Sequence, residues 1–446
     1  MPPPSPPDAA APVGALGDPT YSSPARGRIV IFSASMGAGH DGAADELGRR
    51  LAADGFAVER NDFLDVLPGR LGPLLAGAYH QLLTRAPTGY QRIYGATEHT
   101  RGPGPVVRAL LRSAETRTLR ALPAQAAAVV STYPGASQVL GRLRRRGLLT
   151  VPVVTYLTDF SVHGLWIAAG VDMHLAAHPI PAAQATAQGA ARVRVCGPVA
   201  GACFRPPAAG QRQAARLRFG LDGGTLPLAL LVAGSWGVGD VARAAADIRD
   251  SGVAVPVVVC GRNESLAERL RRQGMDHVHC WIDDMPGLMH ACDVLVQNAG
   301  GLTSLEAFAA GLPVASYRCI PGHGQTNAAA LEEAGLAVWI RERAGLRGTL
   351  TELIDGPLGR AQRERGLSLF AAEHGPADAV AAMADHDALP RRIQPHRRRG
   401  RMRVPAAAVA VAVTALLAVC APLAEAYNDS PADFPTLSHF LDGDRP

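Results

Sequence analysis

DVLVQNAGGLTSLEAFAAGLPVASYRCIPGHGQTN, residues 293–327, decides the fold of this 446-residue chain. The segment predicts a short apolar strand, a Gly-Gly turn, a helix opening at Thr303 or Ser304, a second apolar strand and a glycine-rich loop. A glycine turn before a helix exposes backbone N–H groups at the positive end of the helix dipole, which suits phosphate. Glu306 follows in the first turn, where a carboxylate can accept hydrogen bonds from the hydroxyls of a sugar.

The same alternation of strand and helix extends over most of the chain. Apolar runs predict strands at 29–33, 56–59, 129–131, 153–156 and 173–176, and, after a break rich in Pro and Gly at 204–211, at 228–233, 255–260, 277–281, 294–297 and 314–317. Strands that alternate with helices form parallel sheets covered on both faces. We therefore predict an α/β protein with two Rossmann-like domains that face a cleft, with ligands bound outside the carboxyl ends of the strands.

The ends of the chain differ from this pattern. We expect a disordered Pro-rich N-terminus at 1–25, domains at 26–205 and 206–385, a basic linker at 386–403, an uncharged run at 404–424 and a short tail at 425–446. The uncharged run has 21 residues, enough to cross a bilayer, and its preceding arginines would keep the domains in the cytoplasm. An export signal cleaved near residues 424–426 and a merely buried helix are the alternatives.

Composition excludes several classes of site. The chain has no lysine, so a Schiff-base lysine and a Walker-type phosphate loop are ruled out. Its seven cysteines are scattered without a C-x-x-C pair, which favours reduced thiols over a zinc or disulfide framework. A net charge of +5 with 5% aromatic residues gives no reason to expect nucleic acid as a partner.

The stretch SASMGAGH, residues 33–40, supplies a catalytic candidate and its alternative. His40 opens the helix after the first strand, where it would point into the cleft and act as a general base; a histidine that satisfies local backbone is the plainer interpretation. Gly37, Gly39 and Gly42 also spell G-x-G-x-x-G, with Glu59 twenty residues beyond Gly39. This dinucleotide fingerprint makes an NAD(P)-dependent oxidoreductase the main alternative, although it leaves the glycine loops of the second half unexplained.

Three further segments are candidates. GSWGVG at 234–239, with Gly234, Ser235 and Gly237, follows a predicted strand and offers amides to a diphosphate. Asp159 follows another strand and would orient His40 or an acceptor hydroxyl, or else only cap a helix. Residues 71–94 form either an amphipathic segment that touches lipid or a pair of core-facing helices.

These motifs together resemble the monogalactosyldiacylglycerol synthase and processive diacylglycerol glucosyltransferase family, and more distantly the lipid-II-forming N-acetylglucosaminyltransferase. The likeness covers about Arg28 to Ala384, and its motifs are SASMGAGH (33–40), LTDFSVHGLW (157–166), CGPVAGACFRP (196–206), GSWGVG (234–239), GGLTSLEAFAAGLPV (300–314) and PGHGQTN (321–327). The resemblance implies a glycosyltransferase B (GT-B) fold and metal-independent transfer from a nucleotide sugar, with the first domain on the acceptor side and the second on the donor side.

The resemblance also implies roles for individual residues. It places His40 on the catalytic base and Glu306 on the ribose-binding acid. It assigns a diphosphate turn to Gly300, Gly301, Leu302 and Thr303, and a loop facing the donor sugar to Gln325 and Asn327; Gly39 joins the donor-binding set. The galactolipid synthases carry Gln-Glu after the Pro-Gly of this loop, whereas this chain has His323-Gly324-Gln325.

The expected function is that of an inverting hexosyltransferase in glycolipid synthesis. It would need no metal or cofactor beyond the UDP-sugar, use a lipid acceptor such as diacylglycerol, and act at the cytoplasmic face of the cell membrane. A sugar-nucleotide binder without catalysis is the remaining alternative beside the oxidoreductase.

Overall fold

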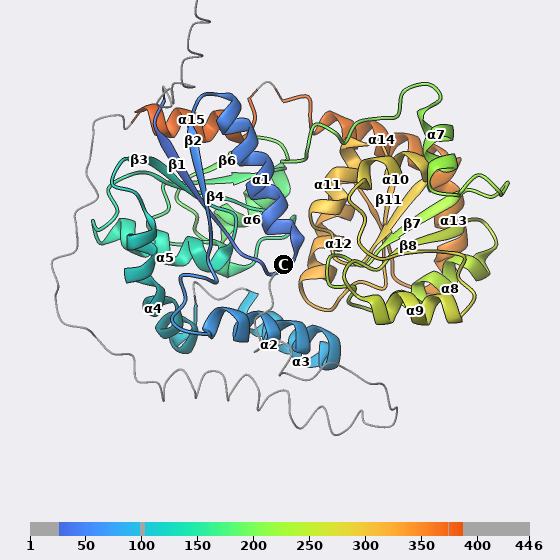
Figure 1. Cartoon of the computed structure of the whole chain (residues 1–446), viewed down its shortest axis with the longest axis horizontal. Coiled ribbons are helices and arrows are strands. Elements are labelled where there is room, and N and C mark those ends of the chain that lie inside the picture. Colours follow the sequence, from blue (N-terminus) through green and yellow to red (C-terminus); the bar gives the residue numbers. More distant parts are fainter. Residues whose placement is uncertain (1–25, 99–102, 373, 387–446) are drawn as a thin grey trace, which may run out of the picture.

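The computed structural model describes residues 26–98, 103–372 and 374–386, which form two α/β domains side by side (Figure 1). Each domain has one parallel sheet of six strands with helices on both faces. The inner strands are almost wholly buried, because parallel sheets lie between two layers of helices. The expected two-domain α/β fold is therefore confirmed.

The first sheet has the order β2-β1-β3-β4-β5-β6. The chain leaves β1 toward β2 and then returns to β3 on the other side of β1, so the order reverses between β1 and β3. The strands are β1 (Arg28–Ser33), β2 (Ala57–Asp62), β3 (Ala126–Ser131), β4 (Val153–Tyr156), β5 (Met173–Ala176) and β6 (Val193–Val195).

The second sheet has the order β12-β11-β10-β7-β8-β9 and reverses between β7 and β10. Its strands are β7 (Leu228–Val232), β8 (Val255–Val259), β9 (His277–His279), β10 (Val294–Gln297), β11 (Val314–Tyr317) and β12 (Val338–Ile340). Ligands of such sheets bind outside the carboxyl ends of the strands at the reversal, which gives each domain one expected binding edge.

The helices connect these strands and cover both faces of each sheet. Those before the second sheet are α1 (Ala38–Ala53), α2 (Leu71–Arg85), α3 (Pro87–Glu98), α4 (Pro105–Ala121), α5 (Pro134–Arg145), the 3₁₀ turn η1 (Gly164–Trp166), α6 (Pro179–Ala187) and α7 (Gln211–Arg218). Those after β7 are α8 (Val241–Ser251), α9 (Glu264–Arg272), α10 (Met285–Ala291), α11 (Leu302–Ala309), α12 (His323–Glu333), α13 (Arg343–Ile354), α14 (Pro357–Ser368) and α15 (Pro376–His386).

The predicted strands are all present, and the differences lie at the edges of the sheets and in one loop. The edge strands β6 and β12 were not predicted, because each has three residues and is only partly buried. The prediction of a glycine-rich loop over the whole of 321–327 is wrong. Helix α12 begins at His323, so Gln325 and Asn327 lie at the start of a helix. Helix α11 begins at Leu302, one residue before the expected start.

The last described helix, α15, packs on the first domain and not on the second (Figure 1). Its residues Ala379, Val380 and Ala384 are buried against α1 and the first sheet. The last helix of the segment 206–385, which was expected to form the second domain, therefore belongs to the first domain. The apolar face of α15 is visible in the sequence, but the sheet that covers it is not.

The segment 71–94 belongs to α2 and α3, which pack toward the second domain. Leu82, Leu83 and Tyr90 are buried there in one cluster with Val238 and Ile320. This observation favours the core-facing pair of helices over the lipid-touching segment.

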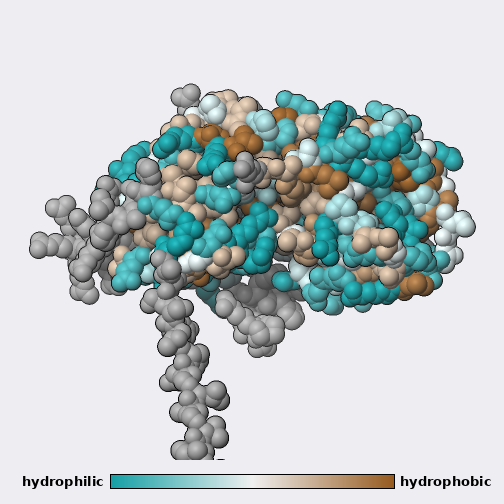
Figure 2. All heavy atoms as spheres, turned by 90° about the horizontal axis from the view of Figure 1, so that it is seen from above, coloured by the Kyte–Doolittle hydropathy of each residue, from teal (hydrophilic) through white to brown (hydrophobic). Residues whose placement is uncertain are grey.

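The predicted membrane anchor at 404–424 and the basic cluster before it lie outside the described residues. Within residues 26–98, 103–372 and 374–386, no helix is long and apolar enough to cross a bilayer. On the face drawn in Figure 2, apolar residues occur in small groups among hydrophilic ones.

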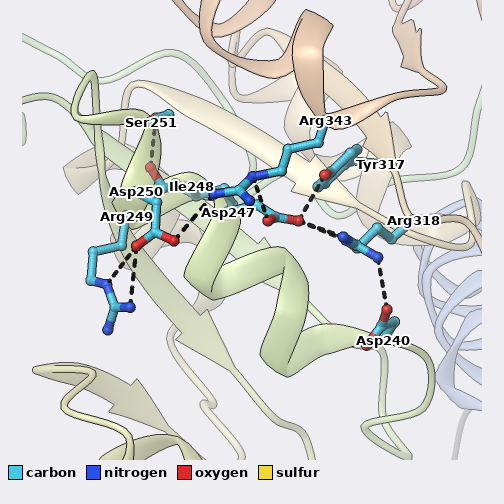
Figure 3. A network of polar contacts seen from close by, with 9 residues as sticks. All are labelled: Asp240, Asp247, Ile248, Arg249, Asp250, Ser251, Tyr317, Arg318 and Arg343. Atoms are coloured by element: carbon cyan, nitrogen blue, oxygen red, sulfur yellow. Dashed lines mark hydrogen bonds and ion pairs between the residues drawn. The ribbon is translucent and has the colours of Figure 1, made fainter.

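A network centred on Asp247 ties three elements of the second domain together (Figure 3). Tyr317 and Arg318, at the end of β11, each donate a hydrogen bond of 2.8 Å to Oδ2 of Asp247 on α8. Arg343 of α13 lies 3.0 Å from Oδ1. Arg318 also reaches Asp240, 2.8 Å away, directly after the glycine loop at 234–239. The network therefore fixes the end of that loop to the end of β11.

We expect Asp247→Ala to lower the free energy of unfolding by about 2–4 kcal/mol, because it leaves the buried Tyr317 hydroxyl without its acceptor and removes the buried carboxylate that Arg318 and Arg343 share. The matched control is Asp250→Asn on the same helix, whose partners Arg249 and Arg343 are largely exposed and whose loss should cost no more than about 0.5–1 kcal/mol. Urea unfolding followed by circular dichroism measures both. Equal losses for the two variants would contradict a structural role for the network.

Candidate active site

The two domains meet through α1 and α11, at the carboxyl edges of their sheets (Figure 1). A cavity of about 230 Å³ lies between them. Its lining comes from α1, from residues 200–204 and from α11: Gly42, Asp45, Glu46, Arg49, Ala200, Gly201, Phe204, Leu302 and Glu306. The reversal points of both sheets thus open toward one interdomain site.

His40 lies in the first turn of α1, at the reversal point of the first sheet. Its Nδ1 is 2.8 Å from the carbonyl oxygen of Thr132, the residue that follows β3. A carbonyl only accepts hydrogen bonds, so Nδ1 carries the proton and Nε2 keeps a lone pair. The Thr158 hydroxyl, 3.0 Å from Nδ1, also fixes the ring. This is the tautomer that a general base at Nε2 requires.

Asp159 lies near His40, but its hydrogen-bond partner is a tryptophan. Its Oδ2 accepts a hydrogen bond of 3.0 Å from Trp166 Nε1–H, and the Trp166 ring lies 5.9 Å from the His40 ring. The contacts that orient the His40 ring come instead from Thr132 and Thr158. Sequence analysis assigned no functional role to Thr132. The positions of both threonines, each just past the end of a strand beside β1 or β3, are the signal that would have found them.

The diphosphate turn has the expected uncapped helix start. Helix α11 follows Gly301, which offers no side-chain oxygen to the first amides of the helix, Leu302 and Thr303. Gly300 has φ +75°, and a Cβ there would lie 2.8 Å from Cβ of Asn327, so only glycine fits. Gln297, a buried residue that sequence analysis missed, shapes the turn: its Oε1 accepts hydrogen bonds from the amides of Ala299 and Gly300.

Two other helices begin in the same way near this turn. Helix α1 follows Gly37 and α12 follows Gly322, and neither glycine provides a side-chain cap. Gly324 of α12 sits against Asn298 and Ala299, just before the turn. Three helix starts without side-chain caps therefore adjoin the site, and each presents the positive end of a helix dipole.

The dinucleotide fingerprint has a different explanation in the structure. A Cβ on Gly42 would collide with the side chain of Leu302 from the other domain, so this glycine allows α1 and α11 to meet. Glu59 pairs with Arg28 at 3.2 Å, near the amino ends of β1 and β2. The acid of a dinucleotide site belongs at the carboxyl edge, which makes the oxidoreductase interpretation untenable for this site.

The loop at 234–239 also joins the domains. Ser235 Oγ accepts a hydrogen bond of 3.2 Å from the amide of Ala38, the first residue of α1. Gly237 and Gly239 are required by packing, since a Cβ on either would clash with Asn263 or Asn298. Gly234 has open space beside it and φ +68°, so it is the glycine of this loop with room for a ligand.

The residues assigned to the donor-sugar loop reach the site, where the structure gives them protein partners. Asn327 is buried; its Oδ1 accepts from the amide of Ser161 at 2.7 Å and its Nδ2 donates to the carbonyl of Ala299 at 3.0 Å. Asn327 is thus a tie between the domains. Gln325 Oε1 lies 3.4 Å from Nε2 of Gln91 on α3.

Glu306 lies in the cavity on the inner side of α11. Burial raises its pKa to about 7, since the ionised carboxylate loses hydration there. Gly39 of the first domain lies near the start of α11, since a Cβ on Gly39 would be 3.9 Å from Cβ of Leu302. Among the described residues, no group of three or more His, Cys, Asp or Glu side chains is arranged to hold a metal ion.

Comparisons with known proteins agree with this architecture. Residues 40–199 match the family model of monogalactosyldiacylglycerol (MGDG) synthase. The chain is 26% identical to the processive diacylglycerol beta-glucosyltransferase of Bacillus cereus (strain G9842) over 294 residues, which are 59% of this chain and 69% of the relative.

Two solved structures share the fold. TcCGT1 in complex with UDP superposes with a TM-score of 0.52 at 13% identity, covering 81% of this chain and 99% of that chain. The glycotransferase of kitacinnamycin gives a TM-score of 0.51 at 16% identity with the same coverage. The chain is therefore a glycosyltransferase of the GT-B fold, and its residues 40–199 are similar to the monogalactosyldiacylglycerol synthase family model.

Proposed function

We propose that the protein is an inverting, metal-independent hexosyltransferase that moves a sugar from a UDP-sugar to a lipid acceptor such as diacylglycerol. The observation that carries the proposal is the packing of the first turn of α1, where His40 Nδ1 meets the carbonyl of Thr132, against the uncapped start of α11. The matched relatives are named diacylglycerol glucosyltransferases, and TcCGT1 holds UDP in the same fold.

The donor would lie on the second domain. The first amides of α11 and the open side of Gly234 meet the diphosphate, and Glu306 accepts hydrogen bonds from the ribose hydroxyls. These fixed dipoles stabilise the negative charge that develops on the departing diphosphate oxygen. The charge needs no metal ion to neutralise it.

The transfer step follows from the position of His40. Nε2 takes the proton of the acceptor hydroxyl while its oxygen forms a bond to the anomeric carbon. The bond from that carbon to the diphosphate oxygen breaks, and UDP leaves with the electron pair. Attack from the first domain and departure toward the second occur on opposite faces of the sugar, so the configuration inverts.

The acceptor assignment places the reaction at a membrane surface. The matched relatives act on diacylglycerol, by their names, and an apolar lipid of this kind resides in the bilayer. The uncharged run at 404–424 and the seven arginines between 391 and 403 would hold the domains at an anionic cytoplasmic face.

We expect His40→Ala to lower kcat by about 10²–10⁴-fold, the usual contribution of a general base, with little change in UDP affinity. The control is His277→Ala, at the start of β9 on the opposite edge of the second sheet. Release of UDP from a UDP-sugar in lipid vesicles containing diacylglycerol measures turnover. Full activity of the His40 variant would remove this residue from the mechanism.

UDP affinity should depend on the ionisation of Glu306. The pKa of this carboxyl is about 7 in the free protein, and its ionised form accepts stronger hydrogen bonds from ribose hydroxyls than its protonated form does. As the pH falls from 8 to 6, the Glu306 carboxylate becomes protonated and must release this proton when UDP binds. The Kd of UDP should therefore rise, by at most about tenfold per pH unit. Glu306→Gln should bind more weakly at pH 8 and lose this part of the pH dependence.

Calorimetry measures the Kd of UDP for the wild type and for Glu306→Gln at each pH. The phosphates of UDP ionise in the same way in both series, so a difference between the two pH profiles reports on the carboxylate of Glu306. Parallel pH profiles for the wild type and the glutamine variant would place Glu306 outside the nucleotide site.

Chelation of divalent metal should leave transfer unchanged. Because backbone amides and helix dipoles meet the diphosphate, we expect the rate with EDTA to stay within about twofold of the rate with added Mg²⁺. The assay is UDP release under both conditions. A loss of activity in EDTA that Mg²⁺ restores would disprove the metal-independent mechanism.

A further inference from the structure

Helix α3 of the first domain contacts the first turns of α12 in the second domain through a row of side chains. Tyr90, Gln91 and Tyr94 lie on one face of α3, next to His323, Gln325 and Thr326. The distances are 3.0 Å from Tyr90 OH to His323 Nδ1, 3.2 Å from Tyr94 OH to Thr326 Oγ1 and 3.4 Å from Gln91 Nε2 to Gln325 Oε1.

This contact is built into the packing of both domains. Gly322, which precedes α12, has φ +72°, and a Cβ there would lie 2.9 Å from Cε1 of Tyr90 and 3.0 Å from Cβ of Tyr94. The rings of α3 therefore occupy the space that a side chain at 322 would fill. Tyr79 and Trp236, with ring centroids 5.9 Å apart, extend the same apolar contact to the 234–239 loop.

His323 lies within electrostatic reach of the opposite side of the site. Burial lowers its pKa, the charge of Asp159 acts to raise it, and His40 acts to lower it further. Burial also raises the pKa of Tyr90, so its hydroxyl stays protonated. The Tyr90 hydroxyl can donate to Nδ1 or accept from it, so the contact fixes the orientation of the imidazole ring in either tautomer.

We propose that Tyr90 is a positioning residue for the donor sugar, which acts by holding the imidazole of His323 in one orientation. His323 is the first residue of α12, whose uncapped start lies against Asn298 and Ala299, just before the turn at Gly300. A helix of the acceptor-side domain would then set the group that reads a sugar hydroxyl in the donor-side domain. The inference rests on the proposed function, because it takes a UDP-sugar as the ligand.

The test is Tyr90→Phe in the full chain, which removes the hydroxyl and keeps the ring. Calorimetry with UDP-glucose and UDP-galactose should show a Kd that is three- to tenfold higher for at least one of them, while the Kd of UDP alone stays within twofold. Tyr94→Phe is the matched control: it removes a hydroxyl on the same helix that faces Thr326 and not the histidine.

A merely structural role predicts a different pattern. Equal losses in Tyr90→Phe and Tyr94→Phe, an equal loss of UDP and UDP-sugar affinity, or no change would each overturn the proposal, as would a wild type that binds neither sugar nucleotide. In a His323→Ala background, Tyr90→Phe should have no further effect, because the residue through which it acts is gone.

The proposed function is tested separately by UDP release from the wild type with lipid. A wild type that binds UDP-sugars but releases no UDP would refute the transferase proposal and leave the differential binding result for Tyr90 standing. A wild type that transfers sugar with the same donor affinity as Tyr90→Phe would refute only the positioning role.

Discussion

The close approach of α1 and α11 is the constraint on which the site depends. The two helices pack closely where the absence of a side chain at Gly42 leaves room for the side chain of Leu302. At the same contact, Ser235 accepts from the amide of Ala38, and Asn327 accepts from that of Ser161. Polar side chains of the second domain thus accept hydrogen bonds from backbone amides of the first domain. These bonds fix the position of His40 relative to the turn at Gly300.

Much of this arrangement could be predicted from local sequence. Apolar runs between glycine turns specify buried parallel strands, and a strand, a glycine and a helix in succession specify an uncapped helix start. The roles of Gly300 and the position of His40 follow from that pattern, since both come directly after a strand at the reversal of its sheet. All the predicted strands are accordingly present, and the strands that were not predicted are the short edge strands β6 and β12.

What could not be predicted depends on contacts between distant segments. Thr132 orients His40 across 92 residues, and α15 crosses back to the first domain, because burial of its apolar face is decided by which sheet is exposed nearby. The same limit applies to Gly42, whose spacing imitates a dinucleotide fingerprint while its neighbour is a leucine of the other domain. A glycine motif indicates the local backbone conformation. Which ligand or side chain lies against that backbone depends on the tertiary structure.

The electrostatics of the cavity show how one chain can hold two acids for different purposes. Burial tends to raise the pKa of Glu46, but hydrogen bonds from Arg49 and Arg50 outweigh it and hold that carboxyl ionised. Glu306 lines the same cavity, and burial is the cause that raises its pKa. An acid already neutralised by arginine has little to gain from a ligand, whereas hydroxyl donors can recover part of the solvation that Glu306 lost on folding. The carboxylate that folding leaves costly to ionise is therefore the one suited to bind a ribose.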